Sequence, residues 1–104
     1  MIRSKRVAIT GVSNGEALED IITGVEGVTR RITEIWVEFL ADRIVRGYID
    51  TDRIVDVHCE TEQAQLLGIP VDHTLEVGQT FKAGLLDEAG AATVQDLTVF
   101  WEET

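Results

Sequence analysis

The sequence contains a single cysteine, Cys59, in 104 residues. One cysteine excludes an intramolecular disulfide, and it excludes a thiolate metal cluster within one chain. No apolar run is long enough to cross a bilayer, and no basic segment followed by an apolar one has the form of a signal peptide. We therefore expect no membrane partner and no secretion by a signal peptide, with the cytoplasm as the default location.

Lysine is scarce, whereas acidic residues are abundant. Two of the nine basic residues are lysine, and 19 acidic residues bring the net charge to −10. Residues 1–53 hold eight bases and nine acids, whereas residues 54–104 hold one base, Lys82, and ten acids. A surface this acidic repels phosphate, so we expect no nucleic-acid partner. Many carboxylates with little lysine also suggest a salt-loving organism, where carboxylates keep a protein surface hydrated.

Proline is nearly absent, and Pro70 is the only one. A residue before proline is held out of the α region, and proline lacks an N–H for a sheet ladder. Ile69-Pro70-Val71 is therefore predicted to be extended, at a sheet edge or in a connection. A hydrophobic fraction of 44% in a chain of this length supports one domain, residues 1–104, with its own core.

Residues 73–103 show the clearest periodicity. Apolar and polar residues alternate from Leu75 to Leu85 and again from Val94 to Trp101, with a break at 87–91 that contains glycine and alanine. A period of two, rich in Val, Thr and aromatic residues, is typical of half-buried strands. We predict a C-terminal β-hairpin, in whose first strand Gly78 marks a bulge or a tight bend.

The earlier segments are shorter and more ambiguous. Residues 6–12 predict a first strand, and 13–28 a loop that carries a short helix. Residues 29–41 fit both a helical and a strand period, but their β-branched and aromatic content favours a strand. Residues 43–59 predict a hairpin, and 60–68 have the composition of a single helical turn. Together these segments predict an all-β fold of about seven or eight short strands, an antiparallel β-sandwich or a small barrel.

Chemically reactive side chains are few. His58 and Glu60 lie two residues apart on one strand face, and His73 follows, which makes part of the ligand set of a metal site in a β-barrel. The second histidine of such a pair is missing, and Cys59 points to the opposite face, so it would need His73 as a catalytic partner. We predict no catalytic residue, no cofactor and no metal. A metal-dependent barrel enzyme that uses His58, Glu60 and His73 is kept as an alternative.

Three aromatic residues are candidates for an interaction surface: Trp36, Tyr48 and Trp101. If Ile35 and Val37 face the core, Trp36 faces outward and needs to be covered, most economically by another subunit. Core packing is the competing interpretation for each tryptophan. A sugar-stacking platform, with Trp36 beside Tyr48, is a third. We expect a homo-oligomer, with these three residues as the hypothetical interface.

Three stretches resemble small viral jelly-roll proteins, which build capsids, turrets and decorations of viruses of archaea and bacteria. They are RRITEIWVEFLA, IVRGYIDTDRIVDV, and LEVGQTFKAGL followed by TVQDLTVFWEE. The resemblance implies a β-sandwich of jelly-roll type and a non-enzymatic virion component that forms a symmetric oligomer with other virion subunits. Because the chain is short for a full capsid jelly roll, it implies a minor or decorating part, and the acidic composition suits a virus of a salt-loving host. The alternative function is a carbohydrate-binding β-sandwich module.

Overall fold

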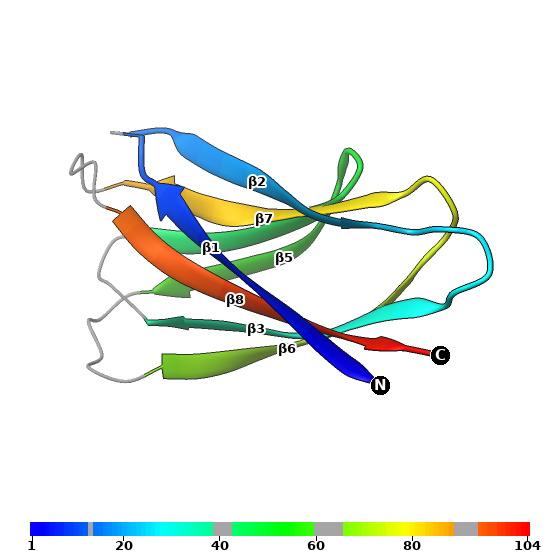
Figure 1. Cartoon of the computed structure of the whole chain (residues 1–104). Coiled ribbons are helices and arrows are strands. Elements are labelled where there is room, and N and C mark those ends of the chain that lie inside the picture. The colour runs from blue at the N-terminus through cyan, green and yellow to red at the C-terminus, as the bar shows by residue number, and fades with distance from the viewer. Residues whose placement is uncertain (13, 39–42, 60–65, 89–93) are drawn as a thin grey trace.

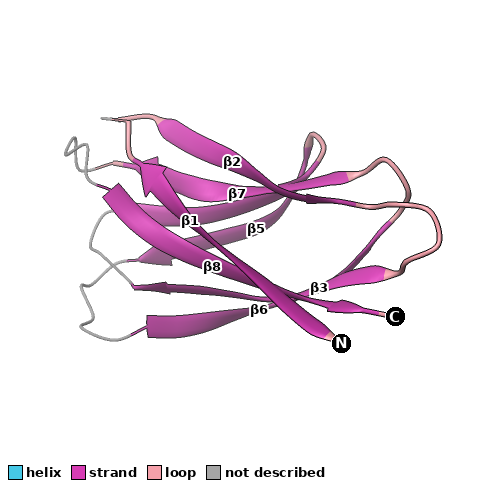
Figure 2. Cartoon of the chain, in the orientation of Figure 1, coloured by secondary structure: helices cyan, strands magenta, loops and turns pink. Residues whose placement is uncertain are grey.

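The computed structural model of the chain describes residues 1–12, 14–38, 43–59, 66–88 and 94–104, which form strands joined by loops and turns (Figure 1). These residues contain eight strands and no helix (Figure 2), hence no helix that could cross a membrane. The strands are β1 (Ile2–Thr10), β2 (Glu16–Thr23), β3 (Arg30–Glu38), β4 (Arg43–Ile49), β5 (Asp52–Cys59), β6 (Leu66–Leu75), β7 (Thr80–Asp87) and β8 (Val94–Glu103).

The strands form two antiparallel sheets of four strands each. The first sheet has the order β1-β8-β3-β6, and the second has the order β2-β7-β4-β5. Only β4 and β5 are neighbours both in the chain and in a sheet, so most connections pass from one sheet to the other. The chain is therefore an antiparallel β-sandwich, as the sequence predicts.

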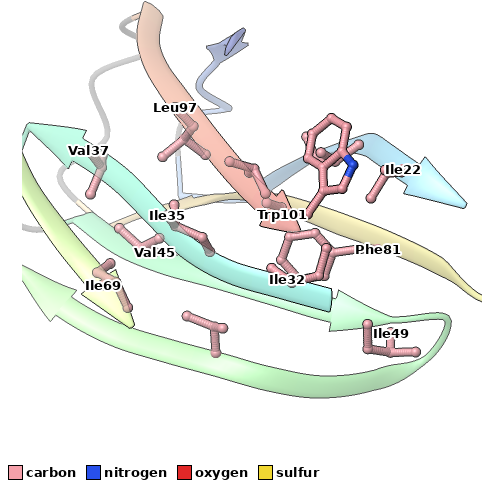
Figure 3. Close-up of a cluster of buried hydrophobic side chains, with 14 of the residues drawn as sticks. Ile22, Ile32, Ile35, Val37, Val45, Ile49, Ile69, Phe81, Leu97 and Trp101 are labelled. Carbon is pink, nitrogen blue, oxygen red and sulfur yellow. The ribbon is translucent and has the colours of Figure 1, made fainter. Parts of the chain in front are cut away.

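The core lies between the two sheets and is built from the inward half of each alternating pattern (Figure 3). Among the described residues, the largest fully buried side chain is that of Phe81 on β7, which lies among aliphatic residues of both sheets. Each fully buried aliphatic side chain stabilises the fold by about 1.5–3 kcal/mol. The other residues of this core are Ile9, Ile21, Ile22, Ile32, Ile35, Val37, Val45, Ile49, Val55, Ile69, Leu75, Ala83, Leu85, Leu97, Val99 and Trp101.

A register shift in β3 changes the phase of its alternation. Ile32 and Ile35 are three residues apart, yet both are fully buried, because the ladder is irregular between Ile32 and Glu34. Thr33, which strict alternation places inside, is half-buried, and its hydroxyl donates a hydrogen bond to the Phe100 carbonyl over 3.2 Å. Beyond this point Ile35 and Val37 face the core and Trp36 faces out, as predicted.

The predicted C-terminal hairpin is wrong. β7 belongs to the second sheet and β8 to the first, so the two strands are not paired. The predicted strand from Leu75 onward also breaks: Leu75 ends β6, and the chain turns before β7 starts at Thr80. Gly78 lies in this turn with a φ of 87°, so it marks a tight bend but no continuous strand. Alternation persists across the turn, which is why the sequence pattern hides it.

The predicted helix within 13–28 is also wrong, because residues 16–23 form β2. A register shift between Asp20 and Ile22 lets the consecutive Ile21 and Ile22 both reach the core, which a regular strand would not allow. The spacing that looked helical comes from this bulge. Residue 13 lies outside the described residues, and Asn14, with a φ of 54°, occupies the predicted turn.

The remaining predicted elements agree with the structure where it describes them, except that the first strand, predicted over residues 6–12, is β1 and starts four residues earlier, at Ile2. Residues 30–38 are strand and not helix. β4 and β5 form the predicted hairpin, with Asp50 at a φ of 53° in its turn. Pro70 lies on β6, an edge strand, as expected for a residue without an N–H. The predicted helical turn falls mostly on residues 60–65, outside the described residues, and β6 begins at Leu66.

Candidate binding surface on the first sheet

The outer face of the first sheet presents side chains in rows that cross the strands. One row runs from Arg6 on β1 through Thr98 on β8 and Trp36 on β3 to Gly68 on β6. We call this surface the Trp36 face. Its members are Ser4, Arg6, Glu34, Trp36, Glu38, Gly68, Pro70, Asp96, Thr98 and Phe100.

The Trp36 side chain is exposed but held in place. The residue is 38% exposed, and its Nε1 donates a hydrogen bond to the Glu34 carboxylate over 2.8 Å. The rings of Trp36 and Phe100 pack edge to face, with a centroid distance of 6.3 Å and an interplanar angle of 66°. A Cβ at Gly68 would stand 3.3 Å from Trp36 Cε2, so the glycine makes room for the ring. An indole fixed in this way loses little conformational entropy when a partner covers it.

A hollow of about 550 Å³ opens beside the indole. Its volume is in the range of small-ligand sites. Arg6 and Trp36 line it together with two carboxylates, those of Glu38 and Asp96. The other lining residues are Val94, Gln95 and Thr98.

Arg6 differs from the other arginines of the chain. The remaining six each lie within 3.9 Å of a carboxylate oxygen, as in the 3.0 Å contact between Arg31 and Glu102. The hydrogen bonds that Arg31 donates to Asp72 and Glu102 are the main reason that its pKa is raised. Within the described part of the chain, Arg6 makes no ion pair and no side-chain hydrogen bond. An unpaired guanidinium is unusual on a surface with so many carboxylates.

Tyr48 lies on the outer face of the second sheet, on the opposite side of the sandwich from Trp36. Its hydroxyl donates to the Glu16 carboxylate over 2.8 Å, and Arg46 bridges Glu16 and Asp56 at 3.0 and 3.4 Å. The hydrogen bond to Glu16 is the main reason that the pKa of Arg46 is raised. The predicted platform of Trp36 beside Tyr48 is therefore wrong, because the two side chains cannot share one surface.

Trp101 is part of the core. It is 9% exposed, and its Nε1 donates to the Glu103 carboxylate over 3.1 Å. Core packing is thus the correct interpretation of Trp101 within the single chain, and the hypothesis that it also takes part in a subunit interface stays a prediction. Of the three aromatic candidates, Trp36 alone combines an outward position with substantial exposure.

The reactive side chains lie on different sheets. His58 is on β5 of the second sheet, exposed and 3.9 Å from Asp56, whereas His73 is on β6 of the first. Glu60 and the side chain of Cys59 lie outside the described residues. Among the residues that are described, no three His, Cys, Asp or Glu side chains come together in a way that could hold a metal ion.

Sequence reasoning found Trp36 but missed its neighbours on the face. Thr98 and Asp96 sit at outward positions of an alternating segment, which was a usable signal. Arg6 is the first residue of the strand predicted over 6–12, and nothing in the sequence singles it out. The register that aligns Arg6 with Thr98 and Trp36 joins segments about 30 and 90 residues apart along the chain, and no local pattern reveals it.

No protein-family model matches the chain, and no curated protein matches it. Among solved structures, an exo-β-1,3-galactanase from Phanerochaete chrysosporium with galactose is similar at 11% sequence identity and a TM-score of 0.47. The similarity covers 98% of this chain and 27% of that one, so the chain spans about a quarter of the galactanase. A similarity this low carries no functional inference.

Proposed function

We propose that this chain is a non-enzymatic structural protein that assembles with copies of itself through the Trp36 face. The observation that carries the proposal is the outward indole, exposed yet already fixed by Glu34, Phe100 and Gly68. Exposed, ordered aromatic side chains with a polar rim are typical anchors of protein interfaces. The carboxylates and Arg6 around the indole form such a rim.

We further propose that this assembly belongs to a virion, as a minor or decorating component. Support comes from the resemblance of the three stretches to viral jelly-roll proteins. It also comes from the strand orders β1-β8-β3-β6 and β2-β7-β4-β5, in which the chain alternates between two sheets as in a jelly-roll sandwich. Particles purified by density gradient from producing cells are expected to carry the chain at a constant ratio to the major shell protein. Recovery of the chain only from the soluble fraction would contradict the virion part.

Light-scattering mass in molar salt tests the assembly itself. We expect the wild-type chain to have the mass of an oligomer and Trp36→Ala to have the mass of one chain. Tyr48→Ala, on the opposite face, is the matched control and is expected to leave the wild-type mass unchanged. A wild-type mass of one chain at all protein and salt concentrations would overturn the proposal.

A carbohydrate-binding module is the second candidate, and the hollow beside Trp36 favours it. An indole wall with carboxylates and a guanidinium offers the stacking surface and the hydrogen-bond partners that a sugar needs. A screen of oligosaccharides for quenching of tryptophan fluorescence separates the two functions. Saturable quenching that Trp36→Ala abolishes, in a chain that stays monomeric, would favour the module. Because Trp101 is buried, the signal reports on Trp36.

A further inference from the structure

The Trp36 face is complementary to itself in charge and shape. We propose that two copies of the chain pair face to face about a twofold axis that runs along β8, so that Arg6 of each copy lies on the indole of the other. The inference rests on the proposed assembly function and names its contact. It follows from the row of Arg6, Thr98 and Trp36 across the sheet.

The strand order dictates what such an axis brings together. β8 is flanked by β1, which carries Arg6, and by β3, which carries Trp36. A twofold axis parallel to β8 exchanges the two sides, so β1 of one copy faces β3 of the other, while Thr98 meets its own equivalent. Strands related in this way run in the same direction, which suits the aligned packing of two twisted sheets. A twofold axis along the row, across the strands, would instead set Arg6 against Arg6.

The chemistry of the facing groups is complementary. Arg6 lacks a carboxylate partner in the described part of the chain, and a guanidinium stacks well on an exposed indole. Each indole is flanked by Glu34 and Glu38 on β3, at the outward positions before and after it. The Glu38 carboxylate makes no ion pair with any described residue, and it lines the same hollow as Arg6. Each guanidinium therefore finds an indole and a carboxylate on the partner, and the contact occurs twice.

The size of the face predicts a pair of moderate strength. Four strands about 4.8 Å apart, with about 3.3 Å per residue over eight residues, give roughly 500 Å² per copy. Two such faces bury roughly 1,000 Å², the lower limit for a specific interface. We therefore expect a dimer that dissociates on dilution.

Two charge reversals and their mixture test the geometry. In Arg6→Glu, the carboxylate of residue 6 on one copy faces the carboxylates of β3 on the other. In Glu38→Arg, the guanidinium groups of residue 6 on one copy and residue 38 on the other face each other. We expect each variant alone to dimerise about 100-fold or more weakly than the wild type, because like charges then face each other at both contacts. An equimolar mixture is expected to form a heterodimer, since each variant supplies the charge that the other lacks. Sedimentation velocity measures all three samples.

Cross-linking at the axis is an independent test that keeps the charges unchanged. In a Cys59→Ser background, Thr98→Cys places one thiol at the twofold axis in each copy, and a short bis-maleimide should join two chains. Asp20→Cys, on the second sheet, is the matched control and should stay uncross-linked. Circular dichroism checks that each cysteine variant is folded. If the Cys59→Ser background does not fold, the mixture of charge variants still tests whether the two copies pair as proposed.

The outcomes separate this inference from the proposed function. An oligomeric wild type whose mass survives Arg6→Glu and Glu38→Arg would overturn the pairing and leave assembly through the Trp36 face standing. Cross-linking of Asp20→Cys instead of Thr98→Cys would overturn both the pairing and the Trp36 face as the contact. A monomeric wild type would overturn both. A monomer whose indole is quenched by a glycan would assign the hollow to a sugar.

Discussion

At the residue scale, one glycine is required by the close approach of two strands. A Cβ at Gly84 of β7 would stand 1.9 Å from the carbonyl oxygen of Ala17 on β2, which no folded chain tolerates. Gly27 differs, because it has a φ of 86° and a Cβ added there would meet nothing within 4 Å. One glycine is needed for space and the other for backbone conformation.

These two glycines predict different losses of stability. We expect Gly84→Ala to lower the free energy of unfolding by more than about 2 kcal/mol, because β2 has to move away from β7. Gly27→Ala is expected to cost about 1 kcal/mol, the strain of a left-handed alanine. Urea denaturation followed by circular dichroism measures both. Equal losses of unfolding free energy in the two variants would show that β2 can move away from β7 at little energetic cost.

A buried ion pair is the second feature at this scale. Arg43 at the start of β4 and Asp87 at the end of β7 lie opposite each other in the sheet. The distance from Arg43 Nη1 to Asp87 Oδ1 is 3.5 Å, and the two residues are 6% and 1% exposed. We expect Asp87→Ala to lower the free energy of unfolding by about 3–5 kcal/mol, since it removes the carboxylate that faces a buried guanidinium.

The double replacement Arg43→Met with Asp87→Leu is the control for this pair. It removes both charges, so it should restore most of the stability that Asp87→Ala loses. Both variants can be compared by urea denaturation. A double variant as unstable as Asp87→Ala would show that the packing of the two side chains, rather than their charges, stabilises this end of the sandwich.

At the scale of elements, Glu103 at the end of β8 links three strands of the first sheet through its carboxylate. Glu103 accepts hydrogen bonds from Trp101 Nε1 at 3.1 Å and Arg30 Nε at 3.2 Å, and Arg3 Nε lies 3.5 Å from its second oxygen. These groups come from β8, β3 and β1. The hydrogen bond from Trp101 is the main reason that the pKa of Glu103 is lowered, with the charges of Arg30 and Arg3 adding to it.

The lowered pKa predicts a dependence of stability on pH. A carboxyl whose pKa is lower in the folded chain contributes stability above its unfolded pKa of about 4.5, and this contribution is lost as the pH falls through the folded value. We expect the free energy of unfolding of the wild type to decrease as the pH drops below 4.5. The free energy of unfolding of Glu103→Gln is expected to decrease less steeply in the same range. Urea titrations from pH 7 to pH 3 measure both slopes. Parallel curves for the two proteins would contradict the role of Glu103.

The elements also show what the sequence could and could not predict. Alternation predicted most strands and the outward position of Trp36, because the period of two follows from strand geometry itself. It could not predict that β7 and β8 part into different sheets, since a strand has the same pattern whichever neighbour it pairs with. It failed at Ile21-Ile22, where a bulge breaks the period. The alignment of Arg6 with Trp36 depends on long-range register. It could not be predicted either, because the pattern of a strand does not reveal which residues it pairs with.

At the scale of the whole molecule, the net charge of −10 opposes any pairing of two copies. Two such charges about 20 Å apart in water repel by about 10 kcal/mol at 0.01 M salt, and this falls to about 1–2 kcal/mol at 0.15 M. In the proposed pair, salt would also weaken the contacts of Arg6 with the partner's carboxylates, but screening affects short, partly desolvated contacts less than long-range repulsion. The long-range repulsion therefore dominates the salt dependence.

We accordingly expect the proposed dimer to tighten steeply as sodium chloride rises from 0.01 M to 0.15 M, and by at most a further factor of about 5–30 up to 1 M, as the remaining repulsion of about 1–2 kcal/mol is screened. Sedimentation equilibrium at each concentration gives the dissociation constant. Glycine betaine at matched osmolality is the control, because it adds no ionic strength and should leave the dimer as weak as in dilute buffer. A dimer that weakens throughout the sodium chloride series would mean that the arginine–carboxylate contacts outweigh the net charge. Steep tightening would explain how so acidic a chain can assemble with itself, and why its assembly would be suited to a salt-rich setting.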